Sequence, residues 1–410
     1  MAASCVQMVI GFSGLVGVIT RYVGPMTIAP LMLLLEISIV DVCFTYISSH
    51  WFSVIVILLL LLTAVYLNHL QIPLPNYSSN RGCGMKSQPL CAMFPYLFAI
   101  CLAWLICVIL TVSEGLPSGA AARTDARTSV LHSAPWFSWP YPGQFGAPSF
   151  NLGVFLGFVA ATLASVIESI GDYYACARVC ELRTPPSHSV NRGIGVEGAG
   201  CLVSGLLGGG VGVTTYSENI GVIGITRVAC RRTMQGAGLL MILLGVFTKV
   251  GAVFATLPDP IIGGVLTLSL SMVGGVGLSS VQLLDLKLSR NVAILGLSIM
   301  AGLLIPKLVQ AMPPKTGSET VDDALKILLT IQMFVGGTAG FFLDNTVPGA
   351  TREQRGLRPR GAAKGVLEQG AVDSYALPAF LERILGRFPA LCYLPFLPNA
   401  RSINESNARL

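Results

Sequence analysis

Three carboxylates lie inside strongly apolar stretches of this sequence, where an ionised group is costly and usually functional. Glu168 and Asp172 are four residues apart in the apolar segment 153–177, so a helix would present both on one face. Glu218 follows a glycine-rich run and a polar patch, and the helical pattern resumes only after it. A carboxylate at the start of a half-helix lies beside unpaired backbone N–H groups and the positive end of the helix dipole. Half-helices that begin within a membrane commonly form the substrate site of a transporter.

The composition places these carboxylates in a membrane protein. The 410 residues are 53% hydrophobic and only 11% charged, and the mean hydropathy is +0.71, whereas about a quarter of the residues of a soluble domain are charged. The net charge of +6 does not indicate nucleic-acid binding, because the basic residues lie in loops and in the tail. The 11 cysteines, Cys201 among them, lie mostly in apolar segments, which is typical of small buried hydrophobes. No nucleotide-binding loop, hydrolase motif or zinc spacing is found, so we expect neither an enzyme nor a resident cofactor.

The apolar segments are compared with the length of about 20 residues that a membrane-spanning helix needs. The seventh, 213–229, is interrupted: it is polar at its start, and we expect an extended stretch near 211–218 before a half-helix. Non-helical backbone at that depth is tolerated only where protein or a cavity surrounds it. We therefore expect an all-α polytopic membrane protein. The eleven segments lie near residues 4–20, 24–47, 52–69, 92–112, 151–177, 194–210, 213–229, 234–256, 260–279, 292–311 and 322–344.

The distribution of charge predicts the orientation. Basic residues gather in alternate loops and in the tail, 347–410, which the positive-inside rule places in the cytosol. The loop 113–150 balances acidic against basic residues and carries Trp136, Trp139 and Tyr141, which is typical of an extracellular loop with aromatic residues at the membrane surface. The tail is rich in Arg, Gly and Pro, so we expect it to be mostly disordered.

Blocks of small and polar residues occur between and within the apolar segments. Residues 168–175 read Glu-Ser-Ile-Gly-Asp-Tyr-Tyr-Ala, and Asn-Arg-Gly at 191–193 is followed by Glu-Gly at 197–198. Residues 218–227 read Glu-Asn-x-Gly-x-x-x-x-Thr-Arg, and two further blocks lie at 257–264 and 344–349. With these blocks, about residues 1–350 of the chain resemble the nucleobase–ascorbate transporter family (solute carrier family 23), and its vertebrate sodium-dependent nucleobase transporters in particular.

The resemblance implies an architecture. Members of that family are similar in having fourteen spans in two inverted seven-span repeats, divided into a core and a gate domain. On this plan residues 1–112 are the remainder of the first repeat, with spans equivalent to four to seven, and 113–150 is the extracellular loop. Residues 151–346 are the second repeat with the substrate site, and 347–410 is the cytosolic tail. The first three spans would precede the chain, and we expect the extended stretch of the tenth span to need a partner strand from the third.

The resemblance also implies a substrate site built from Glu168 and Glu218. A carboxylate accepts the ring or exocyclic N–H groups of a nucleobase, and its charge strengthens each bond. A second acceptor satisfies the second imide N–H of a uracil-like ring. Nucleobase-transporting members carry Glu or Gln at the position of Glu218, whereas ascorbate transporters carry Pro. The structural alternatives are a salt bridge to a neighbouring helix for Glu168 and a helix N-cap for Glu218.

The neighbours of the two glutamates complete the predicted site. Tyr216, Ser217 and Asn219 flank Glu218 and are expected to bind substrate, with Asn219 also tying the half-helix to the eighth span. Asp172 has two equally open roles. It either orients its neighbours or serves the coupling ion, as an oxygen ligand for Na⁺ or as a proton carrier.

The sequence therefore predicts a multi-pass, secondary-active and Na⁺-coupled transporter of uracil or purine bases in the plasma membrane. Its expected partners are a small-molecule substrate, the lipid bilayer and a second copy in a homodimer, with no nucleic acid. One alternative is an L-ascorbate:Na⁺ symporter of the same family. The other is a truncated, non-transporting product that stays in the endoplasmic reticulum or acts by pairing with full-length chains.

Overall fold

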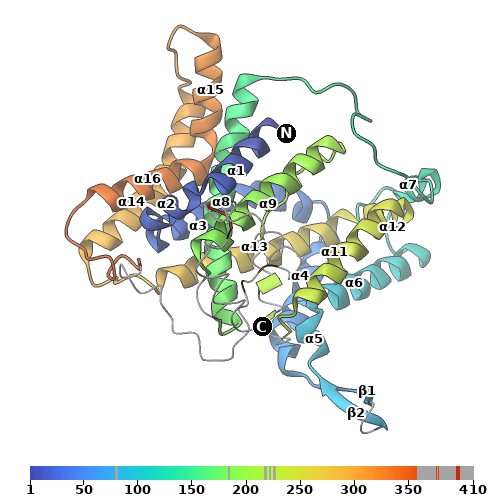
Figure 1. Ribbon diagram of the computed structural model, residues 1–410. Helices are drawn as coiled ribbons and strands as arrows, with labels where there is room; N and C mark the ends of the chain where they lie inside the picture. The colour runs from blue at the N-terminus through green and yellow to red at the C-terminus, as the bar shows by residue number, and fades with distance from the viewer. Residues whose placement is uncertain are drawn as a thin grey trace. The chain divides into compact units, whose positions relative to one another are not determined.

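The computed structural model is mainly helical, as predicted (Figure 1). It describes residues 1–78, 82–182, 185–216, 219–220, 223–224, 228–357, 375, 377 and 394–397. The helices follow the predicted apolar segments because each segment has continuous apolar residues and ends at polar residues, glycine or proline. They are α1 (Ala2–Ser13), α2 (Leu15–Tyr22), α3 (Pro25–Ser48), α4 (Phe52–Leu61), η1 (Leu62–Tyr66), η2 (Leu67–His69), α5 (Leu90–Met93), α6 (Pro95–Val112), α7 (Thr128–Ser133), α8 (Leu152–Val179), α9 (Ser187–Leu206), α11 (Arg231–Val246), α12 (Thr248–Ala255), α13 (Asp259–Val281), α14 (Ser289–Ala311), α15 (Glu319–Thr330) and α16 (Gln332–Thr346).

Six helices of the described part are long and apolar enough to cross a membrane. They are α3, α4 with its continuation to His69, α6, α8, α13 and α14. Two bent pairs, α11 with α12 at 84° and α15 with α16 at 81°, raise the number to eight if each pair is one span. The other predicted segments form the shorter α1 and α2, the more polar α9 and the interrupted segment. The fold class is thus that of a polytopic membrane protein.

A β-hairpin departs from the all-α prediction. Strand β1 (Ile72–Ser78) pairs antiparallel with β2 (Gly82–Gln88), with Ile72 opposite Gln88. The sequence here is rich in Pro, Gly, Asn and Ser, which argues for a loop. The two segments pair because they are adjacent in sequence and each satisfies the backbone groups of the other.

The chain divides into two compact units, each assembled from segments that are distant in sequence. Unit 1 comprises residues 1–38, 141–220 and 273–410, and unit 2 comprises 39–140 and 221–272. Helices α3 and α13 contribute residues to both units. The core of unit 2 is made by α4, α6 and the start of α13, with two loop residues, Leu116 and Ala122, packed on it. Its fully buried side chains include Phe52, Val56, Leu60, Ala99, Ala103, Cys107 and Ile261.

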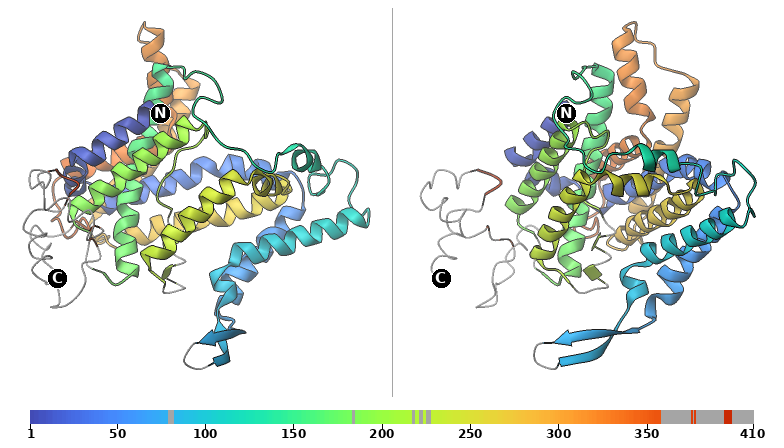
Figure 2. Two further views of the ribbon diagram at one scale, coloured as in Figure 1. Left: turned by 45° about the vertical axis from the view of Figure 1, so that its right-hand side comes forward. Right: turned by 90° about the vertical axis from the view of Figure 1, so that its right-hand side faces the viewer.

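Within unit 1, α1 and α9 lie side by side (Figure 2). Glycines make this close approach possible: a Cβ on Gly11 would overlap the backbone nitrogen of Gly195, and one on Gly198 would lie 2.7 Å from the nitrogen of Met8. Small residues at helix crossings are typical of membrane proteins, in which packing rather than the hydrophobic effect holds helices together. This contact fixes α9 beside α1 and so positions the polar face of α9 that is described below.

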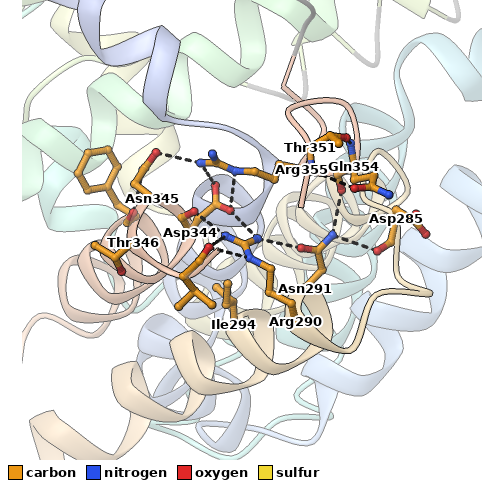
Figure 3. A network of polar contacts seen from close by, with 12 residues as sticks. Asp285, Arg290, Asn291, Ile294, Asp344, Asn345, Thr346, Thr351, Gln354 and Arg355 are labelled. Atoms are coloured by element: carbon orange, nitrogen blue, oxygen red, sulfur yellow. Dashed lines mark hydrogen bonds and ion pairs between the residues drawn. The ribbon is translucent and has the colours of Figure 1, made fainter. Parts of the chain in front are cut away.

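A network of ion pairs and hydrogen bonds is centred on Asp344, near the end of α16 in unit 1 (Figure 3). It joins α14, α16 and the start of the tail. Arg290 of α14 donates to Asp344 at 3.1 Å, and Arg355 donates to the same carboxylate at 2.9 and 2.8 Å. Asn291 donates to the carbonyls of Asp285 and Gln354.

This network also orders the start of the tail. Residues 352–356 form turns, and Leu357 is buried. Further along, the carbonyl of Pro395 accepts a hydrogen bond from Asn191 at 3.0 Å, and Phe396 packs on Phe12. These short segments of the tail therefore contact unit 1 through polar and aromatic partners. Apart from residues 375, 377 and 394–397, the tail from residue 358 onward lies outside the described residues, so its disorder stays a prediction.

Candidate functional site

Helix α8 positions the first two predicted acids. The helix begins at Asn151, whose side chain accepts a hydrogen bond from the backbone N–H of Val154 at 3.1 Å. Glu168 and Asp172 follow on one face, with Asp172 buried and Glu168 half-buried. Within the described part of the chain, the carboxylate of Glu168 has no hydrogen bond and no ion pair. Glu168 therefore has free acceptor capacity in the middle of a membrane-spanning helix.

A third acid, Glu197 of α9, organises the polar groups around α8. Its carboxylate accepts the backbone N–H of Thr215 at 2.6 Å and the hydroxyl of Thr215. It also accepts the hydroxyl of Ser169 at 2.8 and 3.0 Å, and the side-chain amide of Gln7 at 3.2 Å. All of these donors are neutral, so the negative charge of Glu197 is hydrogen-bonded but not neutralised by a cation.

The extended stretch passes over these acids. Residues 211–216 are non-helical, and the described residues 219, 220, 223 and 224 are helical. This is the predicted change from extended to helical backbone. The hydroxyl of Thr214 lies 2.8 Å from that of Ser165 and 3.3 Å from that of Ser169 on α8. The stretch thus lies against α8 on the side of Glu168.

A tight turn after α9 brings the extended stretch 211–216 back to Glu197 and α8. The C-terminus of α9 ends in a Schellman motif, in which Gly208 has a positive φ of 81°. The N–H of Gly208 donates to the carbonyl of Gly205, and the N–H of Gly209 donates to that of Ser204 at 2.8 Å. Glycine is favoured at position 208 because other residues are strained at that φ. The glycine-rich run therefore reverses the chain and returns it along α9.

The electrostatics of the site are negative. Glu168 interacts repulsively with the charges of Asp172 and Glu197. No lysine or arginine of the described residues forms an ion pair with Glu168 or Glu197. Such a site is suited to a cation, a proton or a neutral molecule rich in N–H donors. No cluster of three metal-ligating side chains occurs in the part of the chain searched, so a Na⁺ site at Asp172 stays a prediction.

The structure brings some of the predicted residues together and leaves others untested. Glu168 and Asp172 share one helix face as expected. Tyr216 and Asn219 are both exposed, and the carbonyl of Tyr216 accepts the N–H of Asn219 at 3.2 Å. Ser217 and Glu218 lie outside the described residues, so their roles stay predictions.

Sequence reasoning missed Glu197 and the hydroxyls that surround it. A signal for Glu197 was present, because it is the only acidic or basic residue in the apolar segment 194–210. No such signal marks Ser165, Ser169, Thr214 or Thr215. Hydroxyl residues are common in membrane-spanning helices, and these four converge only after the chain reverses at the Schellman turn.

The similarity of this chain to known proteins extends along most of its sequence and is not confined to the site. The Permease family profile matches residues 1–311. Solute carrier family 23 member 2 of Rattus norvegicus is 43% identical over 404 residues, which are 97% of this chain and 62% of the rat protein. Solute carrier family 23 member 1 of Mus musculus is 41% identical over 414 residues, covering 99% of this chain and 68% of the mouse protein. Nucleobase-ascorbate transporter 1 of Arabidopsis thaliana is 32% identical over 360 residues, or 85% of this chain and 67% of the plant protein.

The matches extend along almost the whole of this chain but not along the whole of its relatives. The chain spans 62% of the length of Solute carrier family 23 member 2. The profile reaches from the first residue to the end of α14, so it covers the blocks that suggested the family from residue 168 to residue 264, while the block at 344–349 lies beyond it. The chain therefore belongs to the permease family that includes the solute carrier family 23 proteins and the plant nucleobase-ascorbate transporters.

Proposed function

We propose that the chain carries the substrate site of a secondary-active nucleobase transporter, with Glu168 as the residue that binds the base. The observation that carries this proposal is the state of the Glu168 carboxylate. It is half-buried within a membrane-spanning helix and has no cationic partner among the described residues. An ionised group in such a place is costly, and the ionisable residues that occur within membrane spans are usually functional.

The surrounding groups are suited to a nucleobase. Glu168 offers acceptor oxygens to ring N–H groups, and the hydroxyls of Ser165 and Thr214 can donate to carbonyl oxygens or accept from amino groups. Glu218, which follows the extended stretch, would supply the second carboxylate that a uracil-like ring needs. The alternating donors and acceptors of a base would thus meet complementary partners on α8 and the extended segment.

The negative charge of the site argues against ascorbate as the first choice. Ascorbate is an anion at neutral pH, and it would enter a site that already holds Glu168, Asp172 and Glu197. An accompanying Na⁺ ion could offset this repulsion, since carboxylate and hydroxyl oxygens are its preferred ligands. The runner-up function is therefore a Na⁺-coupled ascorbate carrier, and the name of the plant relative contains both nucleobase and ascorbate.

A binding experiment separates these proposals. Radiolabelled uracil, hypoxanthine and ascorbate are offered to membranes that contain the chain, with Na⁺ or with choline as the cation. We expect a nucleobase to bind and Na⁺ to increase its affinity. Glu168→Gln should remove this binding. Glu36→Gln is the matched control, because Glu36 is also a half-buried carboxylate within a membrane-spanning helix, where it packs on Gly274.

Two results would count against the nucleobase proposal. One is binding of ascorbate without binding of any base. The other is a Glu168→Gln variant that binds the base as tightly as the unchanged chain, since the carboxylate would then have only a structural role.

A further inference from the structure

The extended segment 211–215 runs back along α9 after the Schellman turn, and side chains of α9 hold its backbone. Ser204 donates to the carbonyl of Val211 at 2.7 Å. The N–H of Val213 donates to the sulfur of Cys201 at 3.1 Å, and the thiol donates to the carbonyl of Val213 at 3.1 Å. One turn further back, Glu197 accepts the N–H of Thr215 at 2.6 Å.

These three contacts form a regular ladder. Glu197, Cys201 and Ser204 are spaced by four and then three residues, so they lie on one face of a helix. Their partners, at positions 215, 213 and 211, are spaced by two residues and so lie on one side of an extended chain. The rise of about 1.5 Å per residue in a helix and about 3.3 Å in a strand makes the two spacings similar. A helix face can therefore pair with alternate residues of a strand.

The intervening residue points to the other side. Thr214 contacts Ser165 and Ser169 of α8, between the rungs made by Val213 and Thr215 with α9. The segment thus lies between two helices, with backbone groups of its odd-numbered residues held by α9 and the side-chain hydroxyl of Thr214 held by α8. A slip of one residue would turn the backbone groups of the even-numbered residues toward α9 and remove these rungs.

We propose that Glu197, Cys201 and Ser204 are positioning residues that fix the register of the segment 211–215. This register sets where the half-helix that contains Asn219 begins, and so where the substrate site is assembled. The inference rests on the proposed function for the identity of that site. The carbonyl of Val211, both backbone groups of Val213 and the N–H of Thr215 are paired by side chains of α9, while the partner strand expected from the third span stays a prediction.

A disulfide trap tests the register directly. A Cβ on Gly212 would lie 3.3 Å from the sulfur of Cys201, which is within reach of a disulfide, whereas a Cβ on Gly210 has no atom within 4 Å. Trypsin releases residues 193–227 as one peptide, in which Cys201 is the only native cysteine. After mild oxidation of the whole chain in membranes, the Gly212→Cys peptide should lose two hydrogens and resist alkylation by maleimide. The Gly210→Cys peptide should take up two maleimides, and equal behaviour of the two variants would overturn the register.

Hydrogen exchange tests the role of the Cys201 rung. In Cys201→Ala, the amide of Val213 should exchange roughly threefold to tenfold faster, which is the effect of losing one hydrogen bond. Cys201→Ser keeps a donor and an acceptor and should restore slow exchange. Cys5→Ala, on the exposed side of α1, is the control and should leave the amide unchanged. Unchanged exchange in Cys201→Ala would show that the rung does not hold the segment.

The link to the substrate site is measured separately. The dissociation constant for the nucleobase should rise about threefold or more in Cys201→Ala and return in Cys201→Ser. Faster exchange with an unchanged dissociation constant would overturn positioning and leave a purely structural contact. If the unchanged chain binds no nucleobase, the proposed function fails. The disulfide and exchange results then still decide whether the ladder exists, because neither needs substrate.

Discussion

Unit 1 contains a buried carboxylate, Asp344, and two half-buried carboxylates, Glu168 and Glu197, whose surroundings are opposite in charge. The side chain of Asp344 is 0% exposed and lies between the guanidinium groups of Arg290 and Arg355. Glu197 accepts hydrogen bonds only from neutral donors, and Glu168 has neither hydrogen bond nor ion pair in the described part of the chain. The first carboxylate is neutralised by its neighbours, whereas the other two keep their charge available.

This difference separates a structural charge from a functional one. A carboxylate between two arginines has all its acceptor capacity used, so it can bind nothing else and serves to hold α14, α16 and the start of the tail together. A carboxylate without a cation can attract a coupling ion or the N–H groups of a substrate. It does so at a cost in stability, because no opposite charge compensates its removal from water. Substitutions should therefore have opposite consequences at the two places.

The largest expected effect on stability is at Asp344. Asp344→Asn removes the charge but not the shape, and it leaves two mostly buried guanidinium groups facing a neutral amide. Breaking a buried ion pair in this way costs about 3–5 kcal/mol. We expect a clear fall in the melting temperature of the detergent-solubilised chain, together with faster proteolysis of the segment 351–357. A melting temperature equal to that of the unchanged chain would refute a structural role for this network.

The exposed pair Arg123–Asp125 is the control for that experiment. Its ions are 2.7 Å apart, but the side chain of Asp125 is 51% exposed, so solvent screens the interaction. Asp125→Asn should leave the melting temperature unchanged. The hydrogen-bonded guanidinium of Arg123 lowers the pKa of the Asp125 carboxyl. The contribution of this pair is therefore present above the ordinary carboxyl pKa of about 4 and is lost only as the pH falls through the lowered value.

Glu168→Gln should show the reverse pattern. The amide is neutral, so no charge remains to be buried, and we expect a melting temperature that is equal to or higher than that of the unchanged chain. Binding of the nucleobase should weaken at least tenfold, because a hydrogen bond to a charged group contributes about 1.5–3 kcal/mol. Parallel measurement of the melting temperature and of the dissociation constant in one preparation checks both. A fall in stability like that of Asp344→Asn would instead assign Glu168 a structural role.

Glu197→Gln should lie between these two variants. The amide oxygen can still accept the N–H of Thr215, while the bonds from Ser169 and Gln7 lose the contribution of the charge. We expect a loss of about 1–2 kcal/mol in stability and a moderate weakening of nucleobase binding through the displaced segment 211–215. Glu197→Ala removes the carboxylate and with it every hydrogen bond that Glu197 accepts. It should therefore reduce both the stability and the binding of the nucleobase clearly more than Glu197→Gln does. Equal effects of the two substitutions would mean that the hydrogen bonds of Glu197 do not matter.

The sequence predicted the helical fold because membrane-spanning segments are marked by local composition. The segment boundaries of α3, α6, α8 and α14 follow directly from the apolar runs. The hairpin of β1 and β2 was missed because its residues have low strand propensity, and pairing between neighbouring segments overrode that preference. The bends between α11 and α12 and between α15 and α16 have no proline or glycine at the break that would have marked them.

The site was predictable only in part, because its contacts depend on the reversal of the chain. Glu168 and Asp172 could be found from their burial in an apolar segment and from helical spacing. The partners of Glu197 could not, since Ser169 and Thr215 belong to different segments that meet only after the Schellman turn. Cys201 was interpreted as a small buried hydrophobe, but its thiol has hydrogen bonds to the backbone N–H and carbonyl of Val213. Composition alone does not reveal such a contact.

The smallest expected effect concerns a third kind of pair, in unit 2. Arg127 of the loop before α7 makes bonds of 2.7 and 2.8 Å to both oxygens of Asp259, at the start of α13, and the two side chains are 43% and 26% exposed. The charge of Asp259 is neutralised by an arginine, as that of Asp344 is, but the pair is partly exposed to solvent. Asp259→Asn should therefore lower the free energy of unfolding by no more than about 1 kcal/mol. Lys249 also holds α7 through the carbonyl of Leu131, and Thr248 holds the segment after α7 through the carbonyl of Pro135. The loosening of the loop around Arg127 should therefore be local: trypsin should cut after Arg127 a few times faster, while the melting temperature stays constant.

High salt should reduce the difference in cleavage rate between the two chains, because it screens the Arg127–Asp259 pair in the unchanged chain as well. A melting temperature lowered as far as in Asp344→Asn would show that burial does not decide how much these ion pairs contribute.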